Sequence, residues 1–529
     1  LWRVTGVQTC ALPIWKIMNT LEGKWIADLG DGTFKNPILY ADYSDPDVIR
    51  VGDDFYMTAS SFTYVPGLPI LHSKDLVNWE IINYAVKKLP DRYNKPVHGC
   101  GVWAPAIRYN DGKFYIYYGD PDIGIFMTWT EDPYGEWSDL ILVKEGVGLI
   151  DTCPLWDDDG KAYIVHGYAN SRCGIKSHIA VCEMTWDGTK AIGEDKIIFN
   201  GTISQPTIEG PKFYKRDGMY YVLSPAGGVP TGWQVAMRSK NVYGPYEDHI
   251  VLRQGLTEIN GPHQGGLVEL ESGESWFVHF QDLEVIGRII HLQPVEWVDG
   301  WPVMGENADT GLCGQPVMRC KKPNVGAEYP ITTIPTSDDF SSDKLGLQWQ
   351  WQANNKEEWY SLTENKGSLR LYSEDLKTKE DKYLWNLPNL LTQLWQAPSM
   401  VATVKVSMPK GVGNNKAVLA VIGQKYGYVA LTDEGIVEYC NGNFKTDNRE
   451  WKVTDKCVGT TEAYLRLEVI SCTNSKEASC RVSYSVDGSD FISLGEFECM
   501  QGKWVGAKFA LACVGEKGGY ADFSNFLVV

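Results

Sequence analysis

The sequence predicts an all-β protein in which a five-bladed β-propeller is followed by an antiparallel β-sandwich. A turn followed by an aromatic-rich strand occurs five times before residue 281, at intervals of about fifty residues. No helical periodicity interrupts these copies, and after about residue 306 the repeat gives way to short alternating strands. These observations favour one supersecondary unit used five times, and then a second all-β domain.

The five copies share a turn that supplies a positive φ or an Asx turn, followed by alternating aromatic and β-branched residues. Each copy therefore predicts a β-hairpin. They read GDDFYMTAS (52–60), DGKFYIYYG (111–119), DGKAYIVHG (159–167), DGMYYVLSP (217–225) and SGESWFVHF (272–280). The aromatic residues in register are Tyr56, Tyr115, Tyr163, Tyr221 and Trp276, which lie 59, 48, 58 and 55 residues apart. Units of this length without a helix predict propeller blades of roughly four strands each.

Prolines precede these aromatic residues at a nearly constant distance. Four lie nine or ten residues upstream and a fifth lies fourteen upstream: Pro46, Pro105, Pro154, Pro211 and Pro262. Proline cannot donate to a strand ladder and is confined to edge strands, and the innermost strand of a blade is an edge that faces the central channel. The prolines therefore predict which strand of each blade lines the channel.

Five side chains of functional interest stand at or beside these prolines: Asp45, Trp103, Asp151, Glu209 and His263. Blade symmetry would bring them to one end of the channel. Acids make up about an eighth of the chain, so three acids at similar offsets could also be solvated turn residues. The proline register favours a functional cluster, because acids that converge on a channel are costly unless they have a task.

Around these residues the sequence resembles glycoside hydrolase family 43, whose members are five-bladed propellers that hydrolyse xylosides and arabinosides with inversion. The resemblance covers nearly all of residues 34–305. It rests on motifs in the family's order, among them SDPDVIRVGDDFYM, GVWAPAI, GLIDTCPLWDDDGKAYIVHG, TIEGPKFYKRDGMYYVLSP, NGPHQGG and GRIIHLQPVEW. It implies that Asp45 is the general base, that Asp151 tunes and orients the acid, and that Glu209 is the general acid.

The resemblance also implies that Arg288 holds sugar hydroxyls and that His263 is a ligand of a buried calcium ion or of its water. Phe62 and Trp103 are predicted to supply apolar faces for the sugar ring. Each assignment has a simpler alternative: a structural salt bridge for Arg288, a channel histidine without metal for His263, and core packing for the two aromatic residues. The chemistry requires no cofactor, so calcium, where it is bound, is expected to be structural.

Inverting hydrolysis agrees with three acids on different blades. One protonated carboxyl group must donate a proton to the leaving oxygen, and an ionised carboxylate must activate water on the opposite face of the sugar. The two groups stand about 6.5–9.5 Å apart so that a water molecule fits between them and the sugar. A third carboxylate nearby raises the pKa of the acid and keeps it protonated near neutral pH.

Composition narrows the class of partner. The chain has 529 residues, is 43% hydrophobic and carries a net charge of −18, with a pI near 5.0. This acidic balance argues against nucleic acid and anionic membrane surfaces, and no apolar run approaches the length of a membrane span. A neutral xylo- or arabino-oligosaccharide fits better. The composition is also compatible with a homo-oligomer.

The first residues need separate treatment. VTGVQTCALPI (4–14) resembles the translation of a sequencing-library adapter, so residues 1–17 are interpreted as a non-native leader and Met18 as the expected start. The segment after Met18 lacks an apolar signal region, which favours a cytoplasmic enzyme, or an extracellular or periplasmic one if a signal peptide was lost upstream. The twelve cysteines other than Cys10 show no metal-ligand spacing, and we interpret them as reduced thiols.

The predicted domains are a catalytic propeller at 18–305, a proline- and glycine-rich linker at 306–335 and a β-sandwich at 336–529. Short alternating strands with turns between them predict the sandwich. Its sequence, including LPNLLTQ and YADFSNF, resembles the concanavalin-like domain that follows the propeller in many xylosidases and arabinofuranosidases of the family. In those relatives a loop of the sandwich narrows the sugar pocket.

The function that the residues and the resemblance predict is a β-xylosidase or α-L-arabinofuranosidase that acts on oligosaccharides of plant hemicellulose. Three alternatives are considered. An endo-arabinanase shares the acids and differs in its loops. A noncatalytic sugar-binding propeller would keep Trp103 and Arg288 but would not need three acids. A retaining fructosidase is disfavoured, because Ser44 precedes DPD and Gly210 follows Glu209, where those enzymes carry other residues.

Overall fold

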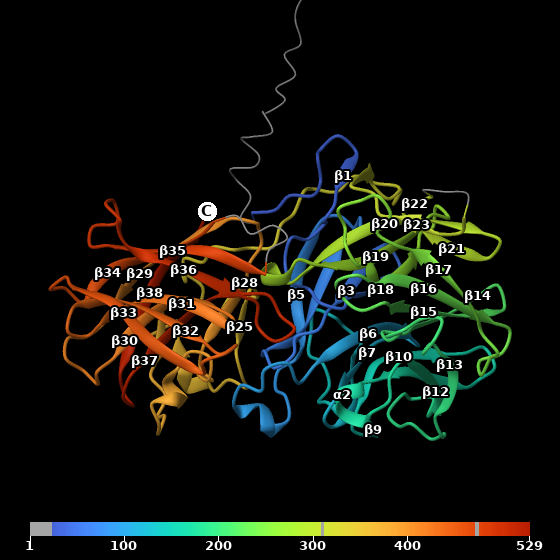
Figure 1. Cartoon of the computed structure of the whole chain (residues 1–529), viewed down its shortest axis with the longest axis horizontal. Helices are drawn as coiled ribbons and strands as arrows, with labels where there is room; N and C mark the ends of the chain where they lie inside the picture. The colour runs from blue at the N-terminus through green and yellow to red at the C-terminus, as the bar shows by residue number, and fades with distance from the viewer. Residues whose placement is uncertain (1–23, 308–310, 471–475) are drawn as a thin grey trace, which may run out of the picture.

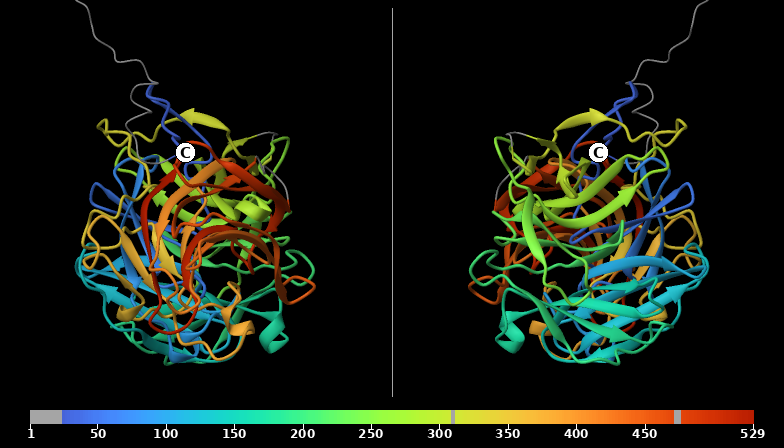
Figure 2. Two further views of the ribbon diagram at one scale, coloured as in Figure 1. Left: turned by 90° about the vertical axis from the view of Figure 1, so that its left-hand side faces the viewer. Right: turned by 90° about the vertical axis from the view of Figure 1, so that its right-hand side faces the viewer.

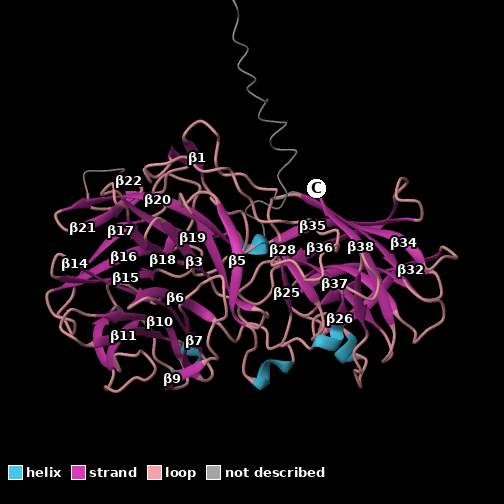
Figure 3. Ribbon diagram, turned by 180° about the vertical axis from the view of Figure 1, so that it is seen from behind, coloured by secondary structure: helices cyan, strands magenta, loops and turns pink. Residues whose placement is uncertain are grey.

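The computed structural model describes residues 24–307, 311–470 and 476–529, so the predicted leader and Met18 lie outside the described residues. Strands dominate the described residues, and the few helices found there are single turns (Figure 3). These are α2 (Asn170–Cys173), η1 (Asp91–Asn94), η2 (Glu284–Ile286), η3 (Glu357–Trp359) and η4 (Glu380–Lys382). None of the described helices has the length and apolarity that a membrane crossing requires.

Five antiparallel sheets follow one another along the chain and form the propeller (Figure 1). Blade 1 contains β2 (Asp47–Val51), β3 (Asp54–Thr58), β4 (Gly67–Ser73) and β5 (Trp79–Val86). Blade 2 contains β6 (Trp103–Asn110), β7 (Lys113–Asp120), β8 (Gly124–Thr130) and β9 (Ile141–Glu145). Blade 3 contains β10 (Leu149–Trp156), β11 (Ala162–Tyr168), β12 (His178–Met184) and β13 (Lys196–Asn200).

The last two blades continue the pattern. Blade 4 contains β14 (Lys212–Arg216), β15 (Met219–Ala226), β16 (Trp233–Ser239) and β17 (Glu247–Leu252), extended by β23 (Gly314–Gln315) and β22 (Glu306–Asn307). Blade 5 contains β18 (His263–Glu269), β19 (Ser275–Asp282), β20 (Arg288–Val298) and β21 (Trp301–Met304). The five-bladed prediction is confirmed. The five aromatic residues in register all lie on the second strand of their blades, opposite the inner strands β2, β6, β10, β14 and β18.

The sandwich has two seven-stranded sheets, which confirms the second part of the fold prediction. One sheet has the order β25 (Trp349–Trp351), β28 (Leu391–Leu394), β37 (Lys508–Val514), β30 (Lys416–Ile422), β31 (Lys425–Thr432), β32 (Ile436–Asn443) and β33 (Arg449–Cys457). The other has the order β26 (Tyr360–Ser361), β27 (Leu369–Tyr372), β38 (Tyr520–Val528), β29 (Met400–Ser407), β34 (Glu462–Val469), β35 (Glu477–Ser485) and β36 (Ile492–Met500). Figure 2 shows the molecule from its sandwich end and from its propeller end.

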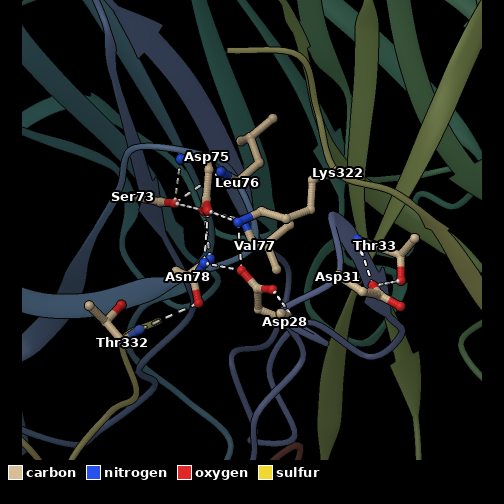
Figure 4. A network of polar contacts seen from close by, with 11 residues as sticks. Asp28, Asp31, Thr33, Ser73, Asp75, Leu76, Val77, Asn78, Lys322 and Thr332 are labelled. Atoms are coloured by element: carbon tan, nitrogen blue, oxygen red, sulfur yellow. Dashed lines mark hydrogen bonds and ion pairs between the residues drawn. The ribbon is translucent and has the colours of Figure 1, made fainter. Parts of the chain in front are cut away.

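A half-buried lysine joins the segment after the propeller to blade 1 (Figure 4). The ammonium of Lys322 lies 2.5 Å from the carboxylate of Asp28 and 2.7 Å from that of Asp75. Asn78 donates to both carboxylates, and the backbone N–H of Thr332 donates to Asn78. Nearby, β1 (Thr33–Lys35) pairs with β24 (Arg319–Lys321). The chain before blade 1 and the chain after blade 5 are therefore held side by side.

Candidate active site

The entry to each inner strand contains one residue in the left-handed region. Its φ is between 30° and 57° in every blade, at Asp45, Ala104, Asp151, Gly210 and Gln264. In blades 2, 3 and 5 the pairing of the first two strands also shifts register at this point. A β-bulge changes the direction in which a side chain points, and a left-handed backbone costs energy in a residue other than glycine. Both features are enriched at functional sites. The predicted acids lie at or next to this position in three blades.

Asp45 is held by two hydrogen bonds at the start of blade 1. Its Oδ1 accepts a charged hydrogen bond from Nη1 of Arg288 at 2.6 Å, and its Oδ2 accepts the hydroxyl of Ser60 at 2.7 Å. Ser60 Oγ itself accepts the backbone N–H of Ala104 at 2.8 Å, which links blades 1 and 2. Asp45 is only 6% exposed. Both carboxyl oxygens of Asp45 therefore accept a hydrogen bond from a protein side chain.

Asp151 and Glu209 form the second half of the cluster. Asp151 Oδ2 accepts the backbone N–H of Gly210 at 2.9 Å, so it touches the backbone that carries Glu209. Burial raises the pKa of Asp151 to about 7, and the charge of Asp45 adds to the effect. Glu209 borders the pocket and is only partly buried, yet burial is also the main reason that its pKa rises to about 8, with the charges of Asp151 and Asp45 contributing. Both carboxyl groups therefore keep a proton to a higher pH than an exposed carboxyl group does.

The carboxyl group of Glu209 makes no hydrogen bond with any residue of the described part of the chain. A protonated carboxyl group that borders a cavity without a protein acceptor can donate its proton to a ligand. Asp45, in contrast, is engaged on both oxygens. The two carboxyl groups therefore have different surroundings in the pocket, and their roles as base and acid stay a prediction.

These side chains line a pocket of about 300 Å³. Six of the seven residues predicted for the site border it: Asp45, Phe62, Trp103, Asp151, Glu209 and Arg288. Phe62 is 3% exposed and packs in a small cluster with Tyr64, Val505 and Trp103, as the core-packing alternative expects, and its contact with a sugar stays a prediction. The structure brings together residues that are up to 243 positions apart in the sequence.

His263 does not border the pocket; its neighbour Gln264 does. The imidazole is 1% exposed, lies edge-on to Phe280 and has its pKa lowered to about 4 by burial, so the ring is neutral. Its Nδ1 is buried without a hydrogen-bond partner, which a bound water could satisfy. Calcium prefers six to eight oxygen ligands, and the described residues contain no group of three His, Cys, Asp or Glu side chains arranged for a metal. Calcium binding stays a prediction, and no catalytic step depends on it.

Sequence reasoning missed the sandwich residue at the pocket. Trp504, in the loop between β36 and β37, borders the pocket and is 54% exposed. Its ring centroid lies 6.3 Å from that of Trp103, edge to face, and the Arg288 guanidinium lies 5.9 Å from its ring. The polar wall formed by Asn170, Ser171 and Lys176 was also missed. No periodicity or motif marks these residues, which reach the pocket from loops and from the single-turn helix α2.

Comparison with known proteins agrees with this geometry. The sequence model of "Glycosyl hydrolases family 43" matches residues 34–302, and that of the "Beta xylosidase C-terminal Concanavalin A-like domain" matches residues 337–528. A protein of Xylanibacter ruminicola is 38% identical over 92% of this chain and 88% of its own. A protein of Formosa agariphila named beta-xylosidase is 33% identical over 98% of this chain and 93% of its own. A Bacteroides ovatus protein named non-reducing end alpha-L-arabinofuranosidase is 34% identical over 77% of both chains.

Solved structures superpose on nearly the whole chain. A bifunctional family 43 protein of Bacteroides eggerthii superposes with a TM-score of 0.80 at 28% identity, covering 94% of this chain and 63% of that one. A family 43 protein of Bacillus licheniformis superposes with a TM-score of 0.78 at 26% identity, covering 94% of this chain and 99% of that one. The family model and these relatives agree, and the chain belongs to glycosyl hydrolases family 43.

Proposed function

We propose that this glycoside hydrolase releases xylose or arabinose from xylo- or arabino-oligosaccharides of plant hemicellulose, with inversion at the anomeric carbon. The observation that carries the proposal is the division of the pocket's carboxyl groups into a paired carboxylate, Asp45, and a protonated acid, Glu209. The names of the relatives, beta-xylosidase and alpha-L-arabinofuranosidase, support the two sugars. A pocket of about 300 Å³ suits a pentose unit and part of its leaving group.

In the proposed reaction Asp45 accepts a proton from a water molecule whose oxygen forms the new bond to the anomeric carbon. The bond from that carbon to the leaving oxygen breaks, and Glu209 donates its proton to that oxygen. The base gains one proton and the acid loses one, so the pair is restored by proton exchange with solvent. Because water attacks from the face opposite the leaving group, the configuration inverts.

Asp151 and Arg288 support these two groups. Asp151 contacts the backbone beside Glu209, and its charge adds to the elevation of the Glu209 pKa. Arg288 donates one of its five N–H groups to Asp45. Those of its other N–H groups that reach the pocket can donate to sugar hydroxyls. The aromatic pair Trp103 and Trp504 gives apolar surface at the pocket, on which a sugar ring can lie.

The test compares two isosteric variants on two kinds of substrate. Glu209→Gln should abolish release of xylose from xylobiose, since a sugar alkoxide must be protonated as it leaves, yet keep measurable activity on a nitrophenyl glycoside. Asp45→Asn should be almost inactive on both, because every substrate needs an activated water. General acid or base catalysis contributes roughly 10²- to 10⁴-fold, which an ordinary assay resolves.

Glu131→Gln is the matched control, because Glu131 is exposed and outside the pocket. Equal losses for Glu209→Gln and Asp45→Asn on both substrates would contradict the division of roles. A covalent sugar adduct trapped on Asp45 would contradict inversion. The same assay run with nitrophenyl xyloside and nitrophenyl arabinofuranoside decides between the two sugars.

A further inference from the structure

A second aspartate, Asp42, lies three residues before the proposed base and does not border the catalytic pocket. It is 7% exposed and accepts three hydrogen bonds. Its Oδ1 accepts the hydroxyl of Ser44 at 3.0 Å and the backbone N–H of Arg288 at 2.9 Å. Its Oδ2 accepts the backbone N–H of Gly506 at 2.8 Å, across the interface with the sandwich. One carboxylate therefore contacts the chain of the base, the chain of the active-site arginine and the sandwich.

The contact between the domains is unusually close at this point. A Cβ atom on Gly287, whose φ is +92°, would lie 2.4 Å from Cγ of Asp42. A Cβ atom on Gly506 would lie 2.1 Å from the carbonyl oxygen of Ile286. The next residue of the sandwich loop, Ala507, donates its N–H to the carbonyl oxygen of Val285 at 2.8 Å. Glycine at both positions lets two backbones pack directly against Asp42.

A buried lysine of the sandwich, Lys508, lies near the carboxylate of Asp42. Lys508, the first residue of β37, is 3% exposed, and its ammonium lies 4.5 Å from the ring centroid of Tyr64. Burial lowers the pKa of Lys508 to about 8, and attraction to Asp42 opposes this effect. Lys508 and Asp42 both line a cavity of about 20 Å³ behind Phe62, which is large enough for one water molecule.

We propose that Asp42 is a positioning residue for catalysis. Its carboxylate fixes the backbone of Arg288 so that the guanidinium meets Asp45, and the same carboxylate holds the sandwich loop whose Trp504 borders the pocket. The sandwich thereby takes part in catalysis through Asp42 as well as through its own side chain. The inference rests on the proposed roles of Asp45 and Arg288 in hydrolysis.

The expected effect follows from how strictly catalytic groups must be placed. A displacement of about 1 Å can cost on the order of 10²-fold in rate. Asp42→Asn is isosteric, but its amide nitrogen cannot accept a hydrogen bond, so either Gly506 or Arg288 loses its acceptor. We expect Asp42→Asn to lower kcat/KM on a nitrophenyl glycoside by about 10- to 100-fold, with a large part of the loss in kcat.

A matched control separates positioning from loosening of the interface. Asn354 is also buried, and its side chain also bridges the domains: it accepts the N–H of Leu89 and donates to the carbonyl oxygen of Leu89, both at 2.8 Å. It lies outside the pocket. Asn354→Ala should therefore lower the unfolding midpoint but leave kcat/KM within about threefold of the wild type. Equal losses of kcat/KM in both variants, or no loss in Asp42→Asn, would overturn the proposal.

A double-mutant cycle with Arg288→Ala tests whether Asp42 acts on catalysis through Arg288. If Asp42 acts through Arg288, adding Asp42→Asn to Arg288→Ala should cost at most about threefold more, because the group that it positions is already gone. The full single-mutant loss repeated on that background would show that Asp42 does not act through Arg288. If Arg288→Ala alone keeps wild-type activity, the proposed role of Arg288 is what fails. Should Asp42→Asn not fold, Ser44→Ala, which removes one donor and keeps the carboxylate, takes its place in the cycle with a smaller loss expected.

Discussion

Replacing the proposed acid should change the stability of the protein in a pH-dependent way as well as its activity. In the folded protein the pKa of Glu209 is raised from 4.5 to about 8, chiefly by burial and then by the charges of Asp151 and Asp45. Between these two values the folded state binds more protons than the unfolded state. The stabilisation from the neutral carboxyl is therefore fully present below pH 4.5 and is lost as pH rises to about 8. Glu209→Gln removes this dependence.

The size of the effect follows from the two pKa values. A difference between 4.5 and about 8 corresponds to about 5 kcal/mol for a group wholly screened from water, at about 1.36 kcal/mol per pH unit. Glu209 borders the pocket, so solvent reduces this amount, and we expect about 2–3 kcal/mol. The unfolding free energy of Glu209→Gln minus that of the wild type should therefore be about 2–3 kcal/mol larger at pH 9 than at pH 5.

The assay is denaturant unfolding of both proteins at pH 5 and pH 9, followed by tryptophan fluorescence, with Glu131→Gln as the control. The difference between variant and wild type is compared at the two pH values, so pH effects shared by the rest of the protein cancel. An unchanged difference would refute the reasoning, since it would mean that Glu209 has the same proton affinity in the folded and unfolded states. The pH profile of kcat gives an independent reading: hydrolysis of oligosaccharides should decline as pH rises through about 8, when the acid loses its proton.

Two further predictions concern structural groups. Lys322→Met leaves the buried carboxylates of Asp28 and Asp75 without their shared cation, which should cost about 3–5 kcal/mol of unfolding free energy in denaturant titrations without changing KM; a loss below about 1 kcal/mol would contradict this. If a calcium ion or its water satisfies the buried Nδ1 of His263, treatment with EDTA should lower the thermal midpoint more than it lowers kcat at 25 °C. Complete loss of turnover in a chelated protein that stays folded would count against a structural role.

The propeller could be predicted because its signals are local. A turn and the strand after it lie within ten residues, and aromatic residues in register, such as Tyr115 and Tyr163, both fall on the second strand of a blade. Prolines marked the inner strand because the edge of a sheet tolerates the missing N–H donor. The predicted acids then met at one pocket, since blade symmetry places equivalent positions around one axis.

The distance in sequence between the proline and the anchor aromatic residue differs from blade to blade for a physical reason that the sequence did not reveal. Counted from the left-handed residue rather than from proline, the anchor aromatic is eleven or twelve residues downstream in every blade. Asp45 and Asp151 occupy that position themselves, whereas Glu209 precedes it and Gly210 occupies it. A bulge adds one residue to a strand, so equivalent side chains can differ by one position in the sequence. Sequence patterns do not show where a bulge falls.

Trp504 and Asp42 could not be predicted for a different reason. Trp504 reaches the pocket from a loop about 400 residues after Trp103 in the sequence, and Asp42 acquires its partner Gly506 across 464 positions. Contacts at such separation depend on how two domains pack, which periodicity within either domain does not encode. For His263 the sequence predicted a place at the site that the structure gives to its neighbour: the NGPHQGG motif indicated His263, but Gln264 borders the pocket.

The packing of the two domains also explains why the sandwich is part of the enzyme rather than an appendage. Its hydrophobic core is continuous with Leu283, Val285, Ile286 and Ile289 of the propeller, all at most 4% exposed. Burying four aliphatic side chains of this size is worth up to about 6–12 kcal/mol, comparable with the whole stability of a typical domain. These residues flank Gly287 and Arg288, so the apolar contact that joins the domains lies next to the arginine that pairs with Asp45.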